Sequence, residues 1–250
     1  VLIFSGFVIA RLEYGEFIYT LSCLPLLLLI VEISVKKRKS SLLFYTPFIV
    51  LFLFLSGQPQ MILYVLLFVF VYALYRYFQT RSKKNIFPQN LLLIGFLSFL
   101  GVGLASFQLL PTFELYRLST INQASSAFIF ERFLVPLTHL FSIFIPNYFS
   151  NPSTYNYWGT SDYIETVVSL GLIPCFFALL ALLKRKNDNS NLTKFFFISV
   201  IISLALAVGW FGSRWFYSLG IPVLSVDVPS RIFVLSTFSL SILAGYGFNI

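Results

Sequence analysis

Residues 107–165 read FQLLPTFELYRLSTINQASSAFIFERFLVPLTHLFSIFIPNYFSNPSTYNYWGTSDYIE, the one long stretch that is too polar and too broken to cross a bilayer. This stretch carries four of the nine acidic residues of the chain and its single histidine, His139. Apolar runs flank it on both sides. We therefore expect any chemistry of the chain to face the compartment into which this stretch projects.

The composition of the 250 residues is that of a membrane protein. Hydrophobic residues make up 58% of the chain and charged residues 10%, whereas a soluble domain carries about 25% charged residues. Apolar runs of the length that a bilayer-spanning helix needs, about 20 residues, recur along the chain. The sequence therefore predicts an all-α, polytopic integral membrane protein.

The positions of the apolar runs predict about eight transmembrane helices. The first and last runs are open at the chain ends, and the chain begins at Val1 without a methionine, so we expect a fragment of a larger protein. We interpret residues 1–250 as a single transmembrane domain. The expected crossings are 1–12, 17–35, 42–55, 61–75, 91–110, 163–183, 195–211 and 231–248.

The net charge of +8 is concentrated in three short loops. These loops, 36–41, 76–90 and 184–194, hold twelve of the seventeen basic residues and lie between apolar runs. Lysine and arginine gather in cytoplasmic loops of membrane proteins. The pattern therefore predicts that the three loops are cytoplasmic, that the loop 107–162 is extracytoplasmic, and that the basic charge does not bind nucleic acid.

Residues 128–145 are apolar but do not suit the hydrocarbon core. They carry Glu131, Arg132, Pro136 and His139, and ionisable groups are costly at that depth. We predict that they form amphipathic helices in the outer interface. We predict the same for residues 214–219, because aromatic side chains of the kind found in membrane interfaces lie among and beside them.

Asp162 and Glu165 are three residues apart at the expected start of a helix, hence on one face. They would complement the helix dipole, or they would form a carboxylate pair for a divalent metal or a sugar hydroxyl. The aromatic stretch just before them includes Tyr157 and Trp158, side chains that commonly stack on sugar rings. Both interpretations remain open from the sequence.

Arg231 falls in the first turn of a helix that Pro229 begins, where a cation opposes the dipole. Asp227, four residues earlier, would pair with it. Alternatively, Arg231 would bind an anion such as a lipid phosphate, because free backbone N–H groups and a guanidinium both favour one. Arg117 or Arg214 would then help Arg231 to hold this phosphate.

Two further polar features have simpler explanations. Glu114 and Arg117 are three residues apart and would form a surface ion pair. A lone histidine such as His139 most often makes only a polar contact.

Several segments together resemble the bacterial YfhO-type membrane proteins, which are related to the GT-C class of lipid-linked sugar transferases. They are SGFVIARLEYGEFIYTLSCLPLLLLIVE (5–32), LSGQPQMILYVLLF (55–68), LASFQLLPTFELYRLS (104–119), SDYIETVVSLGLIPCFFALLALL (161–183) and VPSRIFVLSTFSLSILAGYG (228–247). The resemblance implies transfer of a sugar from a polyprenyl-phosphate-linked donor to a cell-envelope glycan or teichoic-acid acceptor, on the outer face of the bacterial plasma membrane. It also implies a catalytic acidic residue upstream of Val1, so no catalytic role is assigned here.

The expected substrate-binding residues follow from these observations. Arg231, helped by Arg117 or Arg214, would hold the carrier phosphate. The sugar or acceptor would lie against Asp162, Glu165, Tyr157 and Trp158, and a divalent metal is possible but not required. Two alternatives remain open, a transporter or flippase of a lipid-linked glycan and a non-catalytic membrane assembly subunit.

Overall fold

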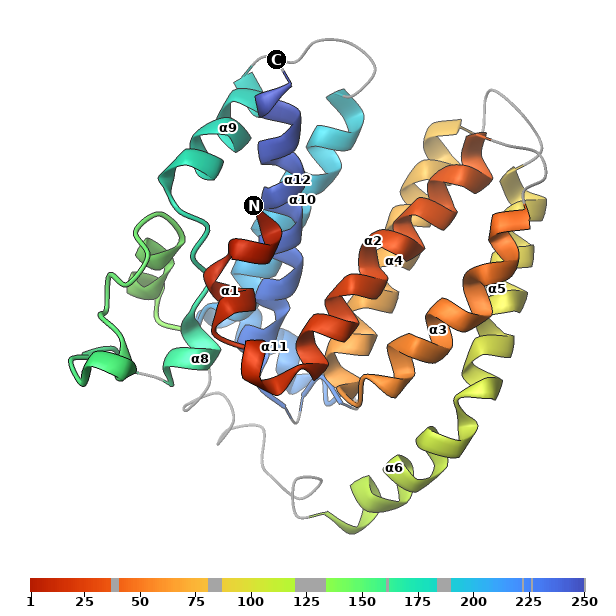
Figure 1. Cartoon of the computed structure of the whole chain (residues 1–250), viewed down its shortest axis with the longest axis horizontal. Helices are drawn as coiled ribbons and strands as arrows, with labels where there is room; N and C mark the ends of the chain where they lie inside the picture. The colour runs from red at the N-terminus through yellow and green to blue at the C-terminus, as the bar shows by residue number, and fades with distance from the viewer. Residues whose placement is uncertain are drawn as a thin grey trace. The chain divides into compact units, whose positions relative to one another are not determined.

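The computed structural model describes residues 1–36, 41–80, 87–119, 134–160, 162–183, 190–221, 223–225 and 227–249 (Figure 1). In these ranges every regular element is a helix, and the only strand-like pairing is an isolated bridge between Val135 and Val208. The all-α prediction is confirmed for this part of the chain. The chain divides into two compact units, one of residues 1–13 and 123–250 and the other of residues 14–122.

The unit of residues 14–122 is built on four helices, α2 (Glu16–Lys36), α3 (Thr46–Leu55), α4 (Pro59–Thr80) and α5 (Phe87–Leu104). Helix α2 packs on α3 and α4, and α3 packs on α5. Each of these helices exposes large apolar side chains as well as burying them, for example Leu26, Phe52, Phe70 and Phe96, as expected of helices that face lipid. An α-helix suits that environment because it satisfies its own backbone hydrogen bonds.

The turn between α3 and α4 lies at the predicted SGQPQ break. Gly57 has a positive φ of 81°, which favours glycine, and α4 begins at Pro59, where proline is tolerated. The side chain of Gln60 is fully buried, and its Nε2 donates to the Tyr64 hydroxyl at 3.4 Å.

The helix predicted over 91–110 is broken. Helix α5 ends at Leu104, and α6 (Ser106–Leu118) leaves it at an angle of 67°. Figure 1 shows α6 turning away from the end of α5. The predicted long loop therefore begins with a helix of its own, on which Arg117 lies.

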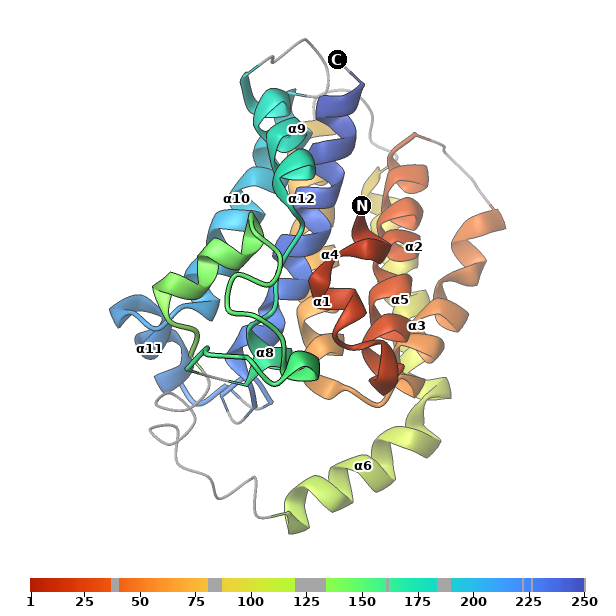
Figure 2. The same ribbon diagram turned by 60° about the vertical axis from the view of Figure 1, so that its left-hand side comes forward.

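The other unit is built around α12 (Phe233–Phe248), which packs against both α9 (Leu172–Leu183) and α10 (Ser190–Ala207). The three helices run side by side in both views (Figure 1 and Figure 2). Helix α12 approaches α9 closely, since a Cβ atom at Gly247 would overlap the carbonyl oxygen of Phe177. Small residues commonly allow such close approach between membrane helices.

Two further predicted helices are also interrupted. The run 1–12 forms short pieces, η1 (Leu2–Phe4) and α1 (Gly6–Ile9), followed by η2 (Leu12–Tyr14). The run 163–183 forms α8 (Tyr163–Thr166), then extended backbone, then α9. Backbone groups at both breaks bond to partners that are distant in the sequence.

These partners are specific. The Gly6 amide donates to the Ser169 carbonyl at 2.7 Å, and the amides of Leu170 and Gly171 donate to the Ile143 carbonyl at 3.1 and 3.0 Å. A backbone group that makes such a hydrogen bond does not need a partner within a continuing helix. Residues 167–171 are therefore held between the N-terminal segment and the long loop.

Three helical segments are long and apolar enough to cross a membrane, namely Phe17–Val35, Pro59–Gln79 and Pro229–Phe248. The bent pair formed by α5 and α6 would make a fourth, and Ser41–Leu55, Leu172–Leu183 and Asn191–Ala207 are shorter apolar helices. Within the described ranges the structure therefore fits a membrane protein with three or four candidate spans. The eight crossings stay a prediction.

Parts of the sequence predictions lie outside the described residues. These parts are residues 37–40, 81–86 and 184–189 of the basic loops, and the first portion of the predicted interfacial segment, including Glu131 and Arg132. The described remainder of that segment forms η5 (Leu137–Ile143). Residues 214–219 lie mostly in α11 (Phe211–Ser218).

Candidate functional site

Charged side chains from three separate segments meet at Glu165 in α8. Its Oε2 accepts from Arg11 Nη2 at 3.2 Å and from the Ser230 hydroxyl at 3.3 Å. Its Oε1 accepts from Arg231 Nη2 at 3.3 Å and Nε at 3.4 Å. Asp227 completes the group by accepting from Arg231 Nη1 at 2.8 Å. We call these five residues the Glu165 cluster.

Arg11 is the most deeply buried member of the cluster, with 0% of its side chain exposed. Its guanidinium lies 4.0 Å from the centre of the Phe7 ring, a cation–π contact. The carboxylate of Glu165 lies 3.2 Å from this guanidinium. A buried cation requires a partner, so Glu165 fixes the N-terminal segment to α8.

Arg231 lies in η8 (Pro229–Ile232), which leads directly into α12. The ion pair with Asp227 expected from the sequence is present, and Glu165 is a second partner that the sequence did not indicate. Glu165 and Arg231 are 66 residues apart, so no local spacing could relate them. Arg231 keeps 16% of its side chain exposed.

Asp162 and Glu165 do not act as a pair of carboxylates in this structure. Asp162 is exposed and its Oδ1 accepts from the Ile164 amide at 3.2 Å, so it caps the N-terminus of α8. Glu165 points into the cluster instead. Among the described residues no group of three histidine, cysteine or acidic side chains is placed to hold a metal ion.

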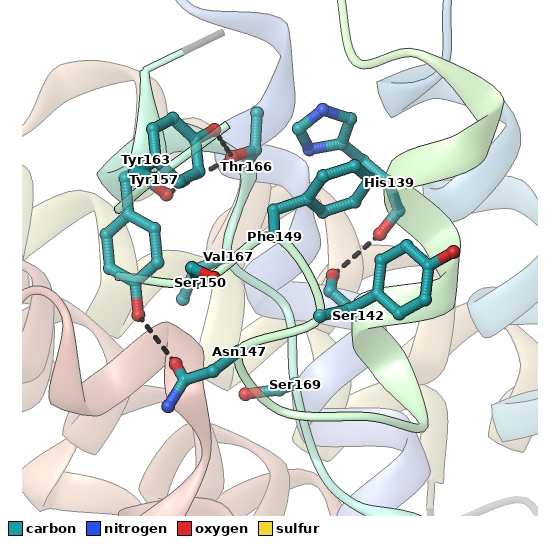
Figure 3. Close-up of a pocket in the computed structure, with 11 residues that line it drawn as sticks. His139, Ser142, Asn147, Phe149, Ser150, Tyr157, Tyr163, Thr166, Val167 and Ser169 are labelled. Atoms are coloured by element: carbon teal, nitrogen blue, oxygen red, sulfur yellow. Dashed lines mark hydrogen bonds between the residues drawn. The ribbon is translucent and has the colours of Figure 1, made fainter. Parts of the chain in front are cut away.

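A small pocket with several polar side chains in its lining lies beside α8, and we call it the His139 pocket (Figure 3). It has a volume of about 10 Å³. Two hydrogen bonds join groups in its wall, Tyr163 hydroxyl to Asn147 Oδ1 at 3.3 Å and Tyr157 hydroxyl with Thr166 Oγ1 at 3.5 Å. Burial raises the pKa of Tyr157. Each lining residue is uncharged or a histidine.

His139 forms one wall of this pocket. Its ring stacks on Phe149, with centroids 4.0 Å apart and planes 12° from parallel. The residue is 2% exposed, and its Nε2 has no hydrogen-bond partner among the described residues. Burial lowers the pKa of the imidazole. Its being the only histidine of the chain is the one feature that singles it out in the sequence.

Exposed aromatic rings adjoin the pocket. Trp158 is 59% exposed and Tyr148 is 41% exposed, and their rings lie 5.8 Å apart. Phe149 lies against both rings, at 4.6 Å from Trp158 and 5.0 Å from Tyr148. We call Tyr148 and Trp158 the aromatic platform. Tyr157 therefore lines the pocket, whereas the next residue, Trp158, belongs to the aromatic platform.

The loop that carries the platform is tightly turned. Asn147 and Ser150 adopt φ values of 57° and 62°, a left-handed conformation that is uncommon outside glycine and asparagine. The Ser150 amide donates to the Asn147 carbonyl at 2.8 Å, and the Trp158 amide donates to the Phe149 carbonyl at 3.2 Å. These bonds hold the two aromatic segments together.

Neither helper arginine is a member of the Glu165 cluster, and Arg117 belongs to the other unit. Arg214 is exposed on α11, and Arg117 is exposed on α6, in the unit of residues 14–122. The described structure does not form the expected ion pair between Glu114 and Arg117. Arg117 lies instead 6.0 Å from the centre of the Phe113 ring.

Comparisons with protein-family models, with curated proteins and with solved structures find no match to this chain. What the protein does is therefore inferred from its own residues and their geometry.

Proposed function

We propose that this protein transfers a sugar from a polyprenyl-phosphate-linked donor to a cell-envelope glycan or teichoic-acid acceptor, at the outer face of the bacterial plasma membrane. The observation that carries the proposal is Arg231, a guanidinium at the beginning of the candidate span Pro229–Phe248. The resemblance of several segments to YfhO-type proteins supports it.

A guanidinium at the end of a membrane span suits a lipid phosphate. The end of a span lies near the interface, where lipid headgroups are, and arginine binds phosphate oxygens through two parallel N–H groups. Asp227 is the more exposed of the two carboxylates on Arg231, at 32% against 16% for Glu165. A carrier phosphate would therefore replace Asp227, while Glu165 keeps the guanidinium oriented.

The sugar of the donor would lie toward α8 and the loop before it. Asp162 and Trp158 belong to this region and are exposed, and Tyr157 is half-buried. Glu165 already accepts hydrogen bonds from Arg11, Ser230 and Arg231. We therefore assign it a positioning role and leave the catalytic base unassigned.

The proposed sidedness follows the charge pattern. The basic loops 36–41, 76–90 and 184–194 would be cytoplasmic, and the loop 107–162 would be extracytoplasmic. With about eight crossings, this arrangement places the Glu165 cluster and the His139 pocket outside.

Sugar transfer by the full-length protein in proteoliposomes tests the proposal, with a polyprenyl-phosphate-linked sugar as donor. Arg231→Ala is expected to lower the transfer rate at least about tenfold, since a charge-assisted phosphate contact contributes about 1.5–3 kcal/mol. Arg76→Ala is the matched control, because Arg76 is a similarly buried arginine whose Nε lies 2.7 Å from Glu32 Oε1.

Equal loss in the two variants would show that any broken ion pair disables the protein. Full activity of a normally inserted Arg231→Ala variant would remove the phosphate-binding role altogether.

The bend of 67° between α5 and α6 favours a second candidate, a flippase of a lipid-linked glycan. Transporters commonly use broken helices at their substrate sites. A fluorescent lipid-linked sugar in the same proteoliposomes separates the two functions. Flipping without any acceptor product would support the second candidate over the first.

A further inference from the structure

The His139 pocket has room for one small polar group. A volume of about 10 Å³ is close to the minimum that holds one water molecule, and a sugar hydroxyl has an oxygen of the same size. A water or hydroxyl there also needs polar partners. The Nε2 of His139 is shielded from solvent and has no partner among the described residues, so it is available to hydrogen-bond such a group.

The lining of the pocket indicates a neutral ligand. Its polar side chains are hydroxyls, one amide and one imidazole, with no carboxylate, lysine or arginine among the lining residues. Burial lowers the pKa of His139, which leaves the imidazole neutral near pH 7. A neutral imidazole offers one donor and one acceptor nitrogen, which suits a hydroxyl better than an ion.

The aromatic platform supplies a second kind of contact beside this pocket. Tyr148 belongs to both, since it lines the pocket and contacts Trp158. The exposed ring of Trp158 offers a flat apolar surface, and such a surface commonly stacks on the C–H face of a sugar ring. The hydrogen bonds of the turned loop from Asn147 to Trp158 hold these rings in place before any ligand arrives.

We infer that the His139 pocket and the aromatic platform together form a subsite for one sugar ring. The ring stacks on Trp158, and one of its hydroxyls enters the pocket and hydrogen-bonds to His139 Nε2. This inference rests on the proposed function, because the sugar would belong to the donor or to the acceptor glycan of that reaction. It adds His139 and Tyr148 to the residues that contact it.

The alternative role for exposed aromatic side chains is anchoring in the membrane interface. Anchoring requires no hydroxyl-sized cavity, and it gives no function to the buried His139 Nε2, which has no hydrogen-bond partner in the part of the chain that the structure describes. The chain offers a matched control, since Trp215 on α11 is exposed to the same extent, 60% against 59% for Trp158.

Saturation-transfer NMR on the full-length protein in nanodiscs tests the subsite. The probes are the methyl glycosides of glucose, galactose and N-acetylglucosamine, at concentrations up to about 100 mM because single sugars bind with millimolar affinity or weaker. We expect saturation transfer to at least one probe. Trp158→Ala is expected to weaken its binding about tenfold, and His139→Phe, which keeps a ring on Phe149, about threefold to tenfold. Trp215→Ala is expected to change nothing.

The absence of saturation transfer to all three probes would overturn the subsite, as would an equal loss in Trp215→Ala. His139→Gln repeats the test should His139→Phe fail to fold, and unchanged sugar binding in the folded variant would remove His139 from the site. The experiment needs no transfer activity. A negative result here with active sugar transfer would reject the subsite alone, and sugar binding without transfer would reject the proposed function alone.

Discussion

At the residue scale, Glu165 bonds to two arginines that the sequence does not place together. Arg11 is 154 residues away and Arg231 is 66 residues away, and the side chain of Arg11 has no exposed surface. Removing one partner of a buried ion pair is costly because the other charge is left uncompensated. Glu165 is therefore expected to stabilise the unit of residues 1–13 and 123–250.

Glu165→Gln is expected to lower the free energy of unfolding by about 3 kcal/mol. Denaturant unfolding of the purified protein in detergent measures this change. Glu114→Gln, at an exposed position on α6, should change it by less than about 0.5 kcal/mol. Similar stabilities for the two variants would show that the cluster does not hold the unit together.

His139 predicts a dependence of stability on pH. Its pKa is lower in the folded protein than the usual 6.5, so the unfolded chain binds the proton more tightly. The stabilising contribution of the neutral imidazole is therefore complete above about pH 6.5 and is lost as the pH falls through and below this value.

Thermal unfolding at pH 7.5 and pH 5.5 tests this dependence, because the chain has no other histidine. The melting temperature should fall at the lower pH, and His139→Phe should remove most of the difference. A fall of the same size in the variant would assign the effect to other groups.

At the scale of elements, two glycines of α5 differ in whether they allow contact with a neighbouring helix. A Cβ atom at Gly101 in α5 would lie 2.7 Å from the Pro47 carbonyl oxygen and 2.7 Å from Val50 Cβ in α3. A Cβ at Gly103, two residues further, would meet nothing within 4 Å. Both glycines look alike in the sequence, but only Gly101 is required for helix contact.

Substitution by alanine should therefore have opposite effects at the two positions. Gly101→Ala is expected to destabilise the protein by about 1–3 kcal/mol through overpacking. Gly103→Ala should stabilise it by up to about 1 kcal/mol, because alanine favours the helix. Unfolding in detergent, measured side by side, checks the sign of each change, and a destabilising Gly103→Ala would contradict the packing described here.

At the scale of the whole molecule, membrane sidedness connects the sequence to the proposed function. The Glu165 cluster and the His139 pocket can meet an envelope glycan only if the loop 107–162 is outside. Tyr155 in this loop is 99% exposed, which makes it a suitable reporter position.

In a background in which Cys23 and Cys175 are replaced by alanine, Tyr155→Cys should react with a membrane-impermeant maleimide in intact cells. Lys186→Cys, in the third basic loop, should react only after the membrane is permeabilised. The reverse labelling pattern would place the proposed carrier site on the wrong side, and the sugar-transfer proposal would have to be abandoned.

The sequence alone determined that the protein is helical and apolar, because hydropathy and helix length are properties of contiguous residues. It also located the Asp227–Arg231 ion pair, whose partners are four residues apart. It did not predict the breaks within 1–12 and 163–183, where backbone groups bond to distant backbone, nor the bend of 67° within 91–110. Only the tertiary structure decided that Glu165 joins Arg11 to Arg231 and that His139 closes a pocket, because these contacts depend on how the chain returns on itself and not on spacing along it.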